Sequence, residues 1–236
     1  MTAGSRILDL IFPRRCAICD EITDGTGELV CRKCQSKIIY MKEPVCMKCG
    51  KQLKRQEQEY CRDCEKGRHV YIRGTALYDY GSMADSIFRF KYAGRMEYAS
   101  FYGRDLFEKK ANWLSVVRPD VLLPVPAHSS RKRKRGYNQA ELIARELAGH
   151  LGIPVNTTLM ERVKKTRPLK NQTHEERQNN LKRAFKIRQN DVKLNTIVII
   201  DDIYTTGSTI DAMATVLRKA GITEIYFMAL TIGRGI

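Results

Sequence analysis

The sequence predicts an α/β protein in which a parallel sheet is flanked by helices and preceded by a small metal-binding unit. Three observations support this prediction. All eight cysteines lie before residue 65. After residue 70, short apolar runs alternate with helical patterns. One apolar run ends in two aspartates, which precede a turn rich in hydroxyl groups. A chain of 236 residues is long enough for both parts, and we expect domains at residues 1–68 and 69–236.

The cysteines form four Cys-x-x-Cys pairs, and each pair begins 15 residues after the previous one. A Cys-x-x-Cys turn places two thiolates on one side of a tight loop, and two such turns complete a tetrahedral zinc site. A short segment with few large apolar side chains needs metal in order to fold. The sequence therefore predicts two structural zinc ions, with these ligands: Cys16, Cys19, Cys31, Cys34, Cys46, Cys49, Cys61 and Cys64.

The even spacing leaves the partition of the zinc ligands open. Sequential pairing is the simplest arrangement, but a cross-brace arrangement fits the spacing too. Disulfides and redox catalysis are the alternatives to zinc. Disulfides are disfavoured because the first twelve residues have neither the apolar core nor the cleavage site of a signal peptide. No segment approaches the roughly 20 apolar residues that span a bilayer. We expect a cytoplasmic protein without membrane insertion, whose cysteines stay reduced.

The pattern after residue 70 predicts strands at 73–80, 121–125, 196–200 and 224–230. It predicts helices at 82–92, 96–112, 138–151 and 208–220. The run at 196–200 is apolar without interruption, which is typical of a strand buried in a parallel sheet. Asn138 is a suitable N-cap for its helix. Strands that alternate with helices indicate a parallel sheet.

Asp201 and Asp202 come at the end of the strand predicted at 196–200, and a helix begins a few residues later. In open parallel sheets, ligands bind outside the carboxyl ends of the strands. The N-terminus of a helix offers free backbone N–H groups to a phosphate, and the two carboxylates can accept from vicinal hydroxyls or help to hold a divalent cation. The pattern therefore predicts a ribose 5-phosphate site. Its phosphate-binding turn is Thr205, Thr206, Gly207, Ser208 and Thr209.

Three other classes share a strand that ends in two aspartates. A P-loop ATPase also needs Gly-x-x-x-x-Gly-Lys-Ser/Thr, which the sequence lacks. A receiver domain places its paired acids near its first strand. A plain buried strand with a capped turn would not need both acids and four hydroxyl groups.

The formal net charge of +16 points to polyanionic partners, namely nucleic acid, phosphorylated metabolites or an acidic surface. The alternative is an ordinary basic, soluble surface. Five consecutive cations, at residues 131–135, are expected to form a solvated, mobile loop until an anion arrives. This loop is either a lid over a pyrophosphate, a nucleic-acid-binding patch or simply a charged loop. A second basic region, residues 162–193, is expected to face the substrate or a nucleic acid backbone.

Residues 197–209 resemble the signature of type I phosphoribosyltransferases. The whole chain resembles the ComF family, which consists of competence-associated, phosphoribosyltransferase-like proteins. Leu10-Ile11-Phe12-Pro13 and the paired cysteines resemble that family's N-terminal double zinc ribbon. The other motifs that carry the resemblance are Pro124-Val125-Pro126, residues 131–139, Arg167-Pro168, Gln172-Thr173, Arg177-x-x-Asn180 and Ala184-Phe185.

The resemblance implies a type I phosphoribosyltransferase fold that binds 5-phosphoribosyl 1-diphosphate with Mg²⁺. Asp201 and Asp202 would bind the ribose hydroxyls, and residues 205–209 would bind the 5-phosphate. The turn at Pro126, Ala127 and His128 would contact pyrophosphate, whose charge the basic run would neutralise through Arg131, Arg133 and Arg135. His128 is the first candidate for a general base.

The resemblance also implies a role in the uptake of single-stranded DNA, with DNA-uptake machinery proteins as partners. It does not name the acceptor of the phosphoribosyl group. Two functions therefore stay open: a phosphoribosyltransferase, or a nucleic-acid-binding or regulatory module that keeps the ribose-phosphate site as a sensor.

Overall fold

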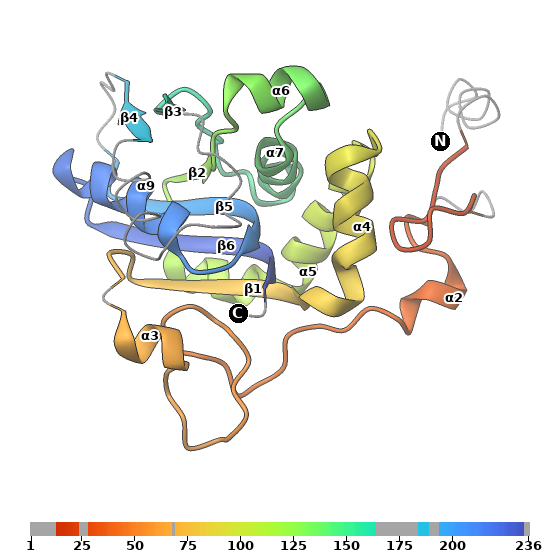
Figure 1. The fold of residues 1–236 in the computed structure, drawn as a ribbon, viewed down its shortest axis with the longest axis horizontal. Coiled ribbons are helices and arrows are strands. Elements are labelled where there is room, and N and C mark those ends of the chain that lie inside the picture. Colours follow the sequence, from red (N-terminus) through yellow and green to blue (C-terminus); the bar gives the residue numbers. More distant parts are fainter. Residues whose placement is uncertain (1–12, 24–27, 68, 164–183, 189–193, 234–236) are drawn as a thin grey trace.

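A four-stranded parallel sheet forms the centre of the computed structural model, which describes residues 13–23, 28–67, 69–163, 184–188 and 194–233 (Figure 1). The strand order is β1-β6-β5-β2, and every pairing is parallel. The predicted parallel α/β sheet is therefore confirmed. The strands are β1 (Arg73–Asp79), β2 (Val121–Pro124), β5 (Thr196–Tyr204) and β6 (Glu224–Ile232).

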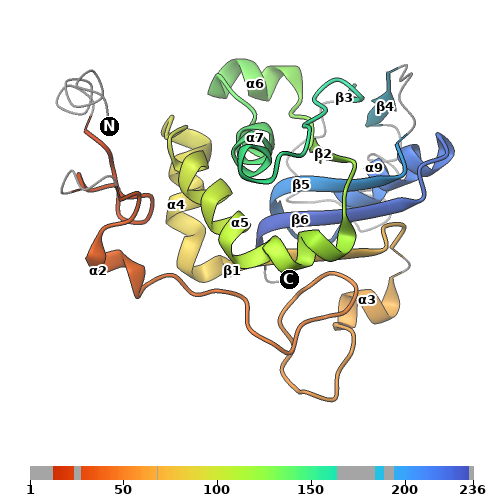
Figure 2. The same cartoon turned by 180° about the vertical axis from the view of Figure 1, so that it is seen from behind.

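Helices cover both faces of this sheet (Figures 1 and 2). Helix α9 (Ser208–Lys219) packs on one face, where Ile197 and Ile199 belong to its core. Helices α4 (Tyr80–Tyr92), α5 (Tyr98–Val117) and α7 (Gln139–Leu151) cover the other face, where Val198 and Ile200 are buried. The unbroken apolar run of β5 is needed because successive side chains enter opposite cores.

Strand β5 is longer than the sequence predicts. It extends to Tyr204, so Asp201 and Asp202 lie within the strand instead of at its end. The reason is β6, which continues as far as Ile232 and pairs with Ile203 and Tyr204. The ladder with β6 therefore runs past the two aspartates, whereas β2 on the other side ends at Pro124, opposite Ile200.

The predicted basic loop is helical, so that prediction is wrong. Helix α6 runs from Ser129 to Arg135. His128 caps its N-terminus by accepting from the backbone N–H of Ser130, and Gly136 ends it with a φ of 84°. Lysine and arginine are good helix formers, and cations near the C-terminus of a helix interact favourably with its last carbonyl groups. These effects offset the mutual repulsion of exposed cations.

A small antiparallel pair lies apart from the main sheet and consists of β3 (Met160–Arg162) and β4 (Phe185–Ile187). Of the second basic region, only Arg162, Lys186 and Arg188 are cations that the structure describes. The motifs at 167–180, and residues 10–12, lie outside the described residues. Among the described helices, none has the length and apolar character that a membrane span requires.

Candidate functional site

The eight cysteines form two zinc-binding sites. The sulfur atoms of each set lie within 4.8 Å of one another. Tetrahedral zinc with Zn–S bonds of about 2.3 Å would place sulfurs about 3.8 Å apart, and the observed Cys19–Cys31 and Cys49–Cys61 sulfur distances are 3.9 and 3.7 Å. The sets are sequential, so the simplest partition is confirmed and the cross-brace is excluded: Cys16, Cys19, Cys31 and Cys34, then Cys46, Cys49, Cys61 and Cys64.

Backbone N–H groups support the first site. Ile18 N and Cys31 N both donate to the Cys16 sulfur at 3.4 Å. Burial raises the pKa of the Cys16 thiol, but backbone hydrogen bonds outweigh this effect and lower the pKa to about 7. The thiolate is the form that binds metal, so these hydrogen bonds favour the ligand form of Cys16.

The acid pair, Asp201 and Asp202, lies on β5 beside a lysine that the sequence analysis missed. Lys91 Nζ from the last turn of α4 is 2.9 Å from Asp202 Oδ1, and both side chains are mostly buried. Asp201 Oδ1 accepts from the backbone N–H of Asp202 at 2.9 Å. No local motif marks Lys91, because it reaches the acid pair only through the packing of α4 on the sheet.

The Asp201 carboxyl group of the acid pair has a raised pKa. Burial, and then the negative charge of Asp202, raise the pKa of Asp201 to about 7, although Lys91 opposes this effect. Near neutral pH, Asp201 is therefore partly protonated and can donate as well as accept a hydrogen bond. Such a pair can bind vicinal hydroxyl groups, and its oxygen atoms suit a hard divalent cation such as Mg²⁺.

The phosphate loop, residues 205–209, connects β5 to α9. Gly207 occupies the N-cap position with a φ of 77°, and Asp211 N donates to Gly207 O at 2.8 Å as the helix begins. Thr206 Oγ1 lies 2.8 Å from Ser208 Oγ. The first backbone N–H groups of a helix have no partner within it, and its dipole favours an anion there. The loop therefore combines free amides and hydroxyl groups one loop length from the acid pair.

Two family models match the chain. The double zinc ribbon domain matches residues 7–65, and the phosphoribosyl transferase domain matches residues 133–234. Competence protein F of Haemophilus influenzae is 36% identical over 114 residues, which cover 48% of this chain and 50% of that protein. Competence protein ComFC of Bacillus subtilis is 31% identical over 153 residues, which cover 62% of this chain and 58% of the relative. Over the matched residues, the chain is similar to these competence proteins.

The chain is also similar to the DNA utilization protein YhgH of Escherichia coli strain K12, with 29% identity over 149 residues that cover 61% of the chain and 64% of YhgH. These matches thus span half to under two thirds of each relative. Solved structures with similar chains include a purine phosphoribosyltransferase from Pyrococcus horikoshii (20% identity, 56% of this chain, 73% of that chain, TM-score 0.36). The adenine phosphoribosyltransferase of Leishmania tarentolae has 16% identity, coverages of 66% and 76%, and a TM-score of 0.34.

The turn after β2 lies next to a polar cavity of about 290 Å³. Pro126 and Ala127 line the cavity, together with Lys132 and Arg162. His128 Nδ1 is used by Ser130, whose N–H donates to it at 3.2 Å. A base role for His128 would therefore fall to Nε2.

The three arginines of α6 do not share one face. Arg131 and Arg135 are four residues apart and lie on the same side of the helix, whereas Arg133 is two residues from each and points elsewhere. Arg135 lies over the Tyr92 ring at 4.7 Å and donates to Gln139. Burial, and then the positive charge of Arg131, lower the pKa of Arg162, while the negative charge of Asp201 opposes them. Arg162, which the sequence placed only in a broad basic region, is thus close enough to both Arg131 and Asp201 to interact with them electrostatically.

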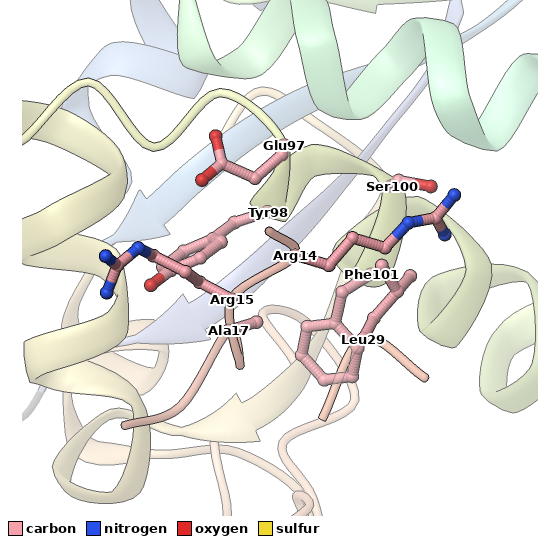
Figure 3. Close-up of a pocket in the computed structure, with 8 residues that line it drawn as sticks. All are labelled: Arg14, Arg15, Ala17, Leu29, Glu97, Tyr98, Ser100 and Phe101. Carbon is pink, nitrogen blue, oxygen red and sulfur yellow. The ribbon is translucent and has the colours of Figure 1, made fainter. Parts of the chain in front are cut away.

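A second cavity, of about 250 Å³, lies between the first zinc site and α5. Figure 3 shows Arg14 and Arg15 directed to opposite sides of this pocket, with the rings of Tyr98 and Phe101 in its wall. The pocket therefore combines two guanidinium groups with aromatic surface.

Proposed function

We propose that the chain binds 5-phosphoribosyl 1-diphosphate with Mg²⁺ and acts as a phosphoribosyltransferase. The observation that carries this proposal is the order of groups along β5 and α9. The acid pair, in which Asp201 has a raised pKa, lies one loop length from the N-terminus of α9, whose N-cap is Gly207. Vicinal ribose hydroxyls would bind the acid pair, and the 5-phosphate would bind the loop.

The pyrophosphate of the substrate would lie at the turn formed by Pro126, Ala127 and His128. Arg131 and Arg162 are the cations best placed to neutralise it, because Arg162 interacts electrostatically with both Arg131 and Asp201. Mg²⁺, held by carboxylate and phosphate oxygens, would neutralise further charge. An acceptor would form its bond to C1 of the ribose while the C1–O bond breaks, and pyrophosphate would leave with the electron pair. Such catalysis rests on positioning and on charge stabilisation.

Calorimetric titration of the zinc-loaded chain with 5-phosphoribosyl 1-diphosphate and Mg²⁺ tests this proposal. The wild type should bind in the micromolar range, and Asp201→Asn should lose about 100-fold in affinity, since a charge-assisted hydrogen bond and a metal ligand disappear together. Asp85→Asn, an exposed charge change on α4, is the matched control. A folded wild type that shows no heat of binding would refute the proposal.

Nucleic-acid binding is the second candidate function. It is favoured by the pocket that combines Arg14 and Arg15 with Phe101, because arginines and aromatic rings together hold the phosphates and bases of single strands. The net charge of +16 agrees with such a partner. The relatives' names, which mention competence and DNA utilization, support a role that involves DNA. Under this candidate, we also propose DNA-uptake machinery proteins as partners and a cytoplasmic location.

A salt titration of fluorescent oligothymidine binding separates the two candidates. Counterion release predicts that log K falls linearly with log salt concentration. The double substitution Arg14→Gln with Arg15→Gln should weaken oligonucleotide binding about 10-fold, whereas Asp201→Asn should leave it unchanged. Binding without a salt slope would eliminate the nucleic-acid candidate.

A further inference from the structure

The segment that follows the second zinc site in the chain is hydrogen-bonded to α9, the helix that begins at the phosphate loop. His69 Nδ1 lies 2.7 Å from Asp211 Oδ2, and Val70 N donates to Asp211 Oδ1 at 2.8 Å. Asp211 is in the first turn of α9. Both oxygens of this carboxylate are therefore engaged by residues that follow the zinc ligand Cys64 closely in the chain. The His69 side chain is only 8% exposed, so water competes little for these contacts.

A second fastening joins the same segment to the strand end before the loop. Tyr71 Oη lies 2.7 Å from Tyr204 Oη, and both residues are buried. Burial raises the pKa of both phenols, so one hydroxyl donates and the other accepts. The rings are also packed: Tyr71 stacks on His69 at 4.9 Å, and Tyr204 stacks on Phe227 at 4.6 Å.

The side chains of His69 and Tyr204 both lie against Gly207 of the phosphate loop. A Cβ atom built on Gly207 would lie 2.6 Å from Tyr204 Oη and 3.0 Å from His69 Cε1. The backbone of the loop is thus packed directly against them in a conformation with positive φ, which glycine adopts readily. His69 and Tyr204 form the wall that defines how the loop presents its amides.

The second zinc site is built into the same core. Cys46, Cys49 and Cys61 pack in one cluster with Tyr71 and Tyr204. Gly74 N on β1 donates to Lys48 O, between two zinc ligands, at 2.8 Å. A zinc ion at this site would hold together the cysteine loops that pack in the same core as the segment of residues 69–71. The fit of the sulfur distances to tetrahedral zinc supports a metal at this point.

We propose that the second zinc site is a positioning element of the phosphate loop. Through His69 and Tyr71 it holds the loop and the first turn of α9 in the anion-binding arrangement. The identity of the anion rests on the proposed function, but the linkage itself does not. Zinc at the first site has no such role, because its described contacts lead to α4 and α5.

Hydrogen exchange at the start of α9, residues 211–214, tests the linkage without substrate. The double substitution of Cys61 and Cys64 by Ser should speed exchange there at least about 10-fold, since local opening becomes easier when its anchor is lost. Substitution of Cys31 and Cys34 by Ser is the matched control and should leave these amides protected. Equal exchange in both variants would overturn the proposal.

Single variants that keep all eight zinc ligands provide a second test if the cysteine variants do not fold. Tyr71→Phe and His69→Ala should each speed exchange at residues 211–214 and raise the Kd for 5-phosphoribosyl 1-diphosphate about 10-fold, which corresponds to one lost hydrogen bond. His69→Asn, which keeps a donor near Nδ1, should restore part of both effects. Tyr98→Phe removes a comparable hydroxyl contact at the first zinc site and should change neither.

The two readouts separate the two proposals. Unchanged exchange in both Tyr71→Phe and His69→Ala would refute the linkage, whatever the ligand. A wild type that does not bind 5-phosphoribosyl 1-diphosphate would refute the proposed function, while the exchange comparison would still decide the linkage.

Discussion

The two zinc sites have the same ligands and spacing, yet they attach to different parts of the molecule. One of the differences between them is the residue after the second cysteine. This residue is Asp20 in the first site and Gly50 in the second, and both have positive φ, at 67° and 75°. Asp20 forms an ion pair with Arg95 at 2.7 Å and accepts from Tyr98 at 2.6 Å. Gly50 instead lets the strand β1 approach closely.

The residues next to the cysteines therefore determine which part of the molecule each zinc site contacts. The first site joins the helices on one face of the sheet through the polar contacts of Asp20 and through Cys16 and Cys34, which belong to the core there. The second contributes three of its cysteines to the core on the other face, which also contains Tyr204. Its neighbours connect it to the candidate substrate site.

The largest effect is expected from giving the second site the residue type of the first. In Gly50→Asp, the new Cβ would lie 2.8 Å from Thr75 Cα and 2.9 Å from Gly74 O. Backbone atoms cannot move without disturbing the strand, so the second zinc site should no longer pack on β1. The expected cost is about 3 kcal/mol or more in the free energy of unfolding. Urea denaturation of the zinc-loaded protein measures this cost. A Gly50→Asp variant as stable as the wild type would show that the close approach is unimportant.

A smaller effect is expected from Asp20→Asn, which keeps a residue that tolerates positive φ. Loss of the charge-assisted hydrogen bonds should cost about 1–2 kcal/mol, because Asp20 and Arg95 are partly exposed. Urea denaturation at pH 7 gives this value. The affinity for 5-phosphoribosyl 1-diphosphate should be unchanged. A large loss of this affinity would contradict the inference that only the second zinc site positions the phosphate loop.

The same variant has a predictable pH dependence. Burial raises the pKa of Asp20, but the hydrogen bonds from Arg95 and Tyr98 outweigh it and leave the pKa below its ordinary value. The carboxylate therefore contributes stability above its unfolded pKa of about 3.9, and this contribution is lost as the pH falls through the lower folded pKa. The stability difference between wild type and Asp20→Asn should be constant from about pH 5 to 8 and shrink below about pH 4. A difference that grows in acid would contradict this assignment.

The smallest effect is expected for Tyr98→Phe, which removes a single hydroxyl from the contact with Asp20. We expect a loss of about 1 kcal/mol in the free energy of unfolding. Tyr71→Phe should cost a similar amount, so thermal denaturation alone would not tell them apart. Hydrogen exchange at residues 211–214 distinguishes the two variants, because only Tyr71→Phe should accelerate it.

Sequence alone determined those features whose chemistry is local. A Cys-x-x-Cys turn brings its two sulfurs together within one loop, so the pairs predict zinc without knowledge of the fold. The acid pair and the phosphate loop are contiguous, and the apolar run before them predicts a buried parallel strand. The sequence pattern at residues 131–135 does not reveal a helix, because the repulsion between like charges opposes the helix propensity of lysine and arginine.

Tertiary structure decided the contacts between residues far apart in the chain. The even spacing of the cysteines fits two partitions, and only the fold selects the sequential one. Lys91 reaches Asp202 because α4 packs on the sheet, and His69 reaches Asp211 across 142 residues. Such contacts leave no periodic or contiguous pattern in the sequence. They depend on how helices and strands pack, so the connection between the second zinc site and the phosphate loop is visible only in the folded chain.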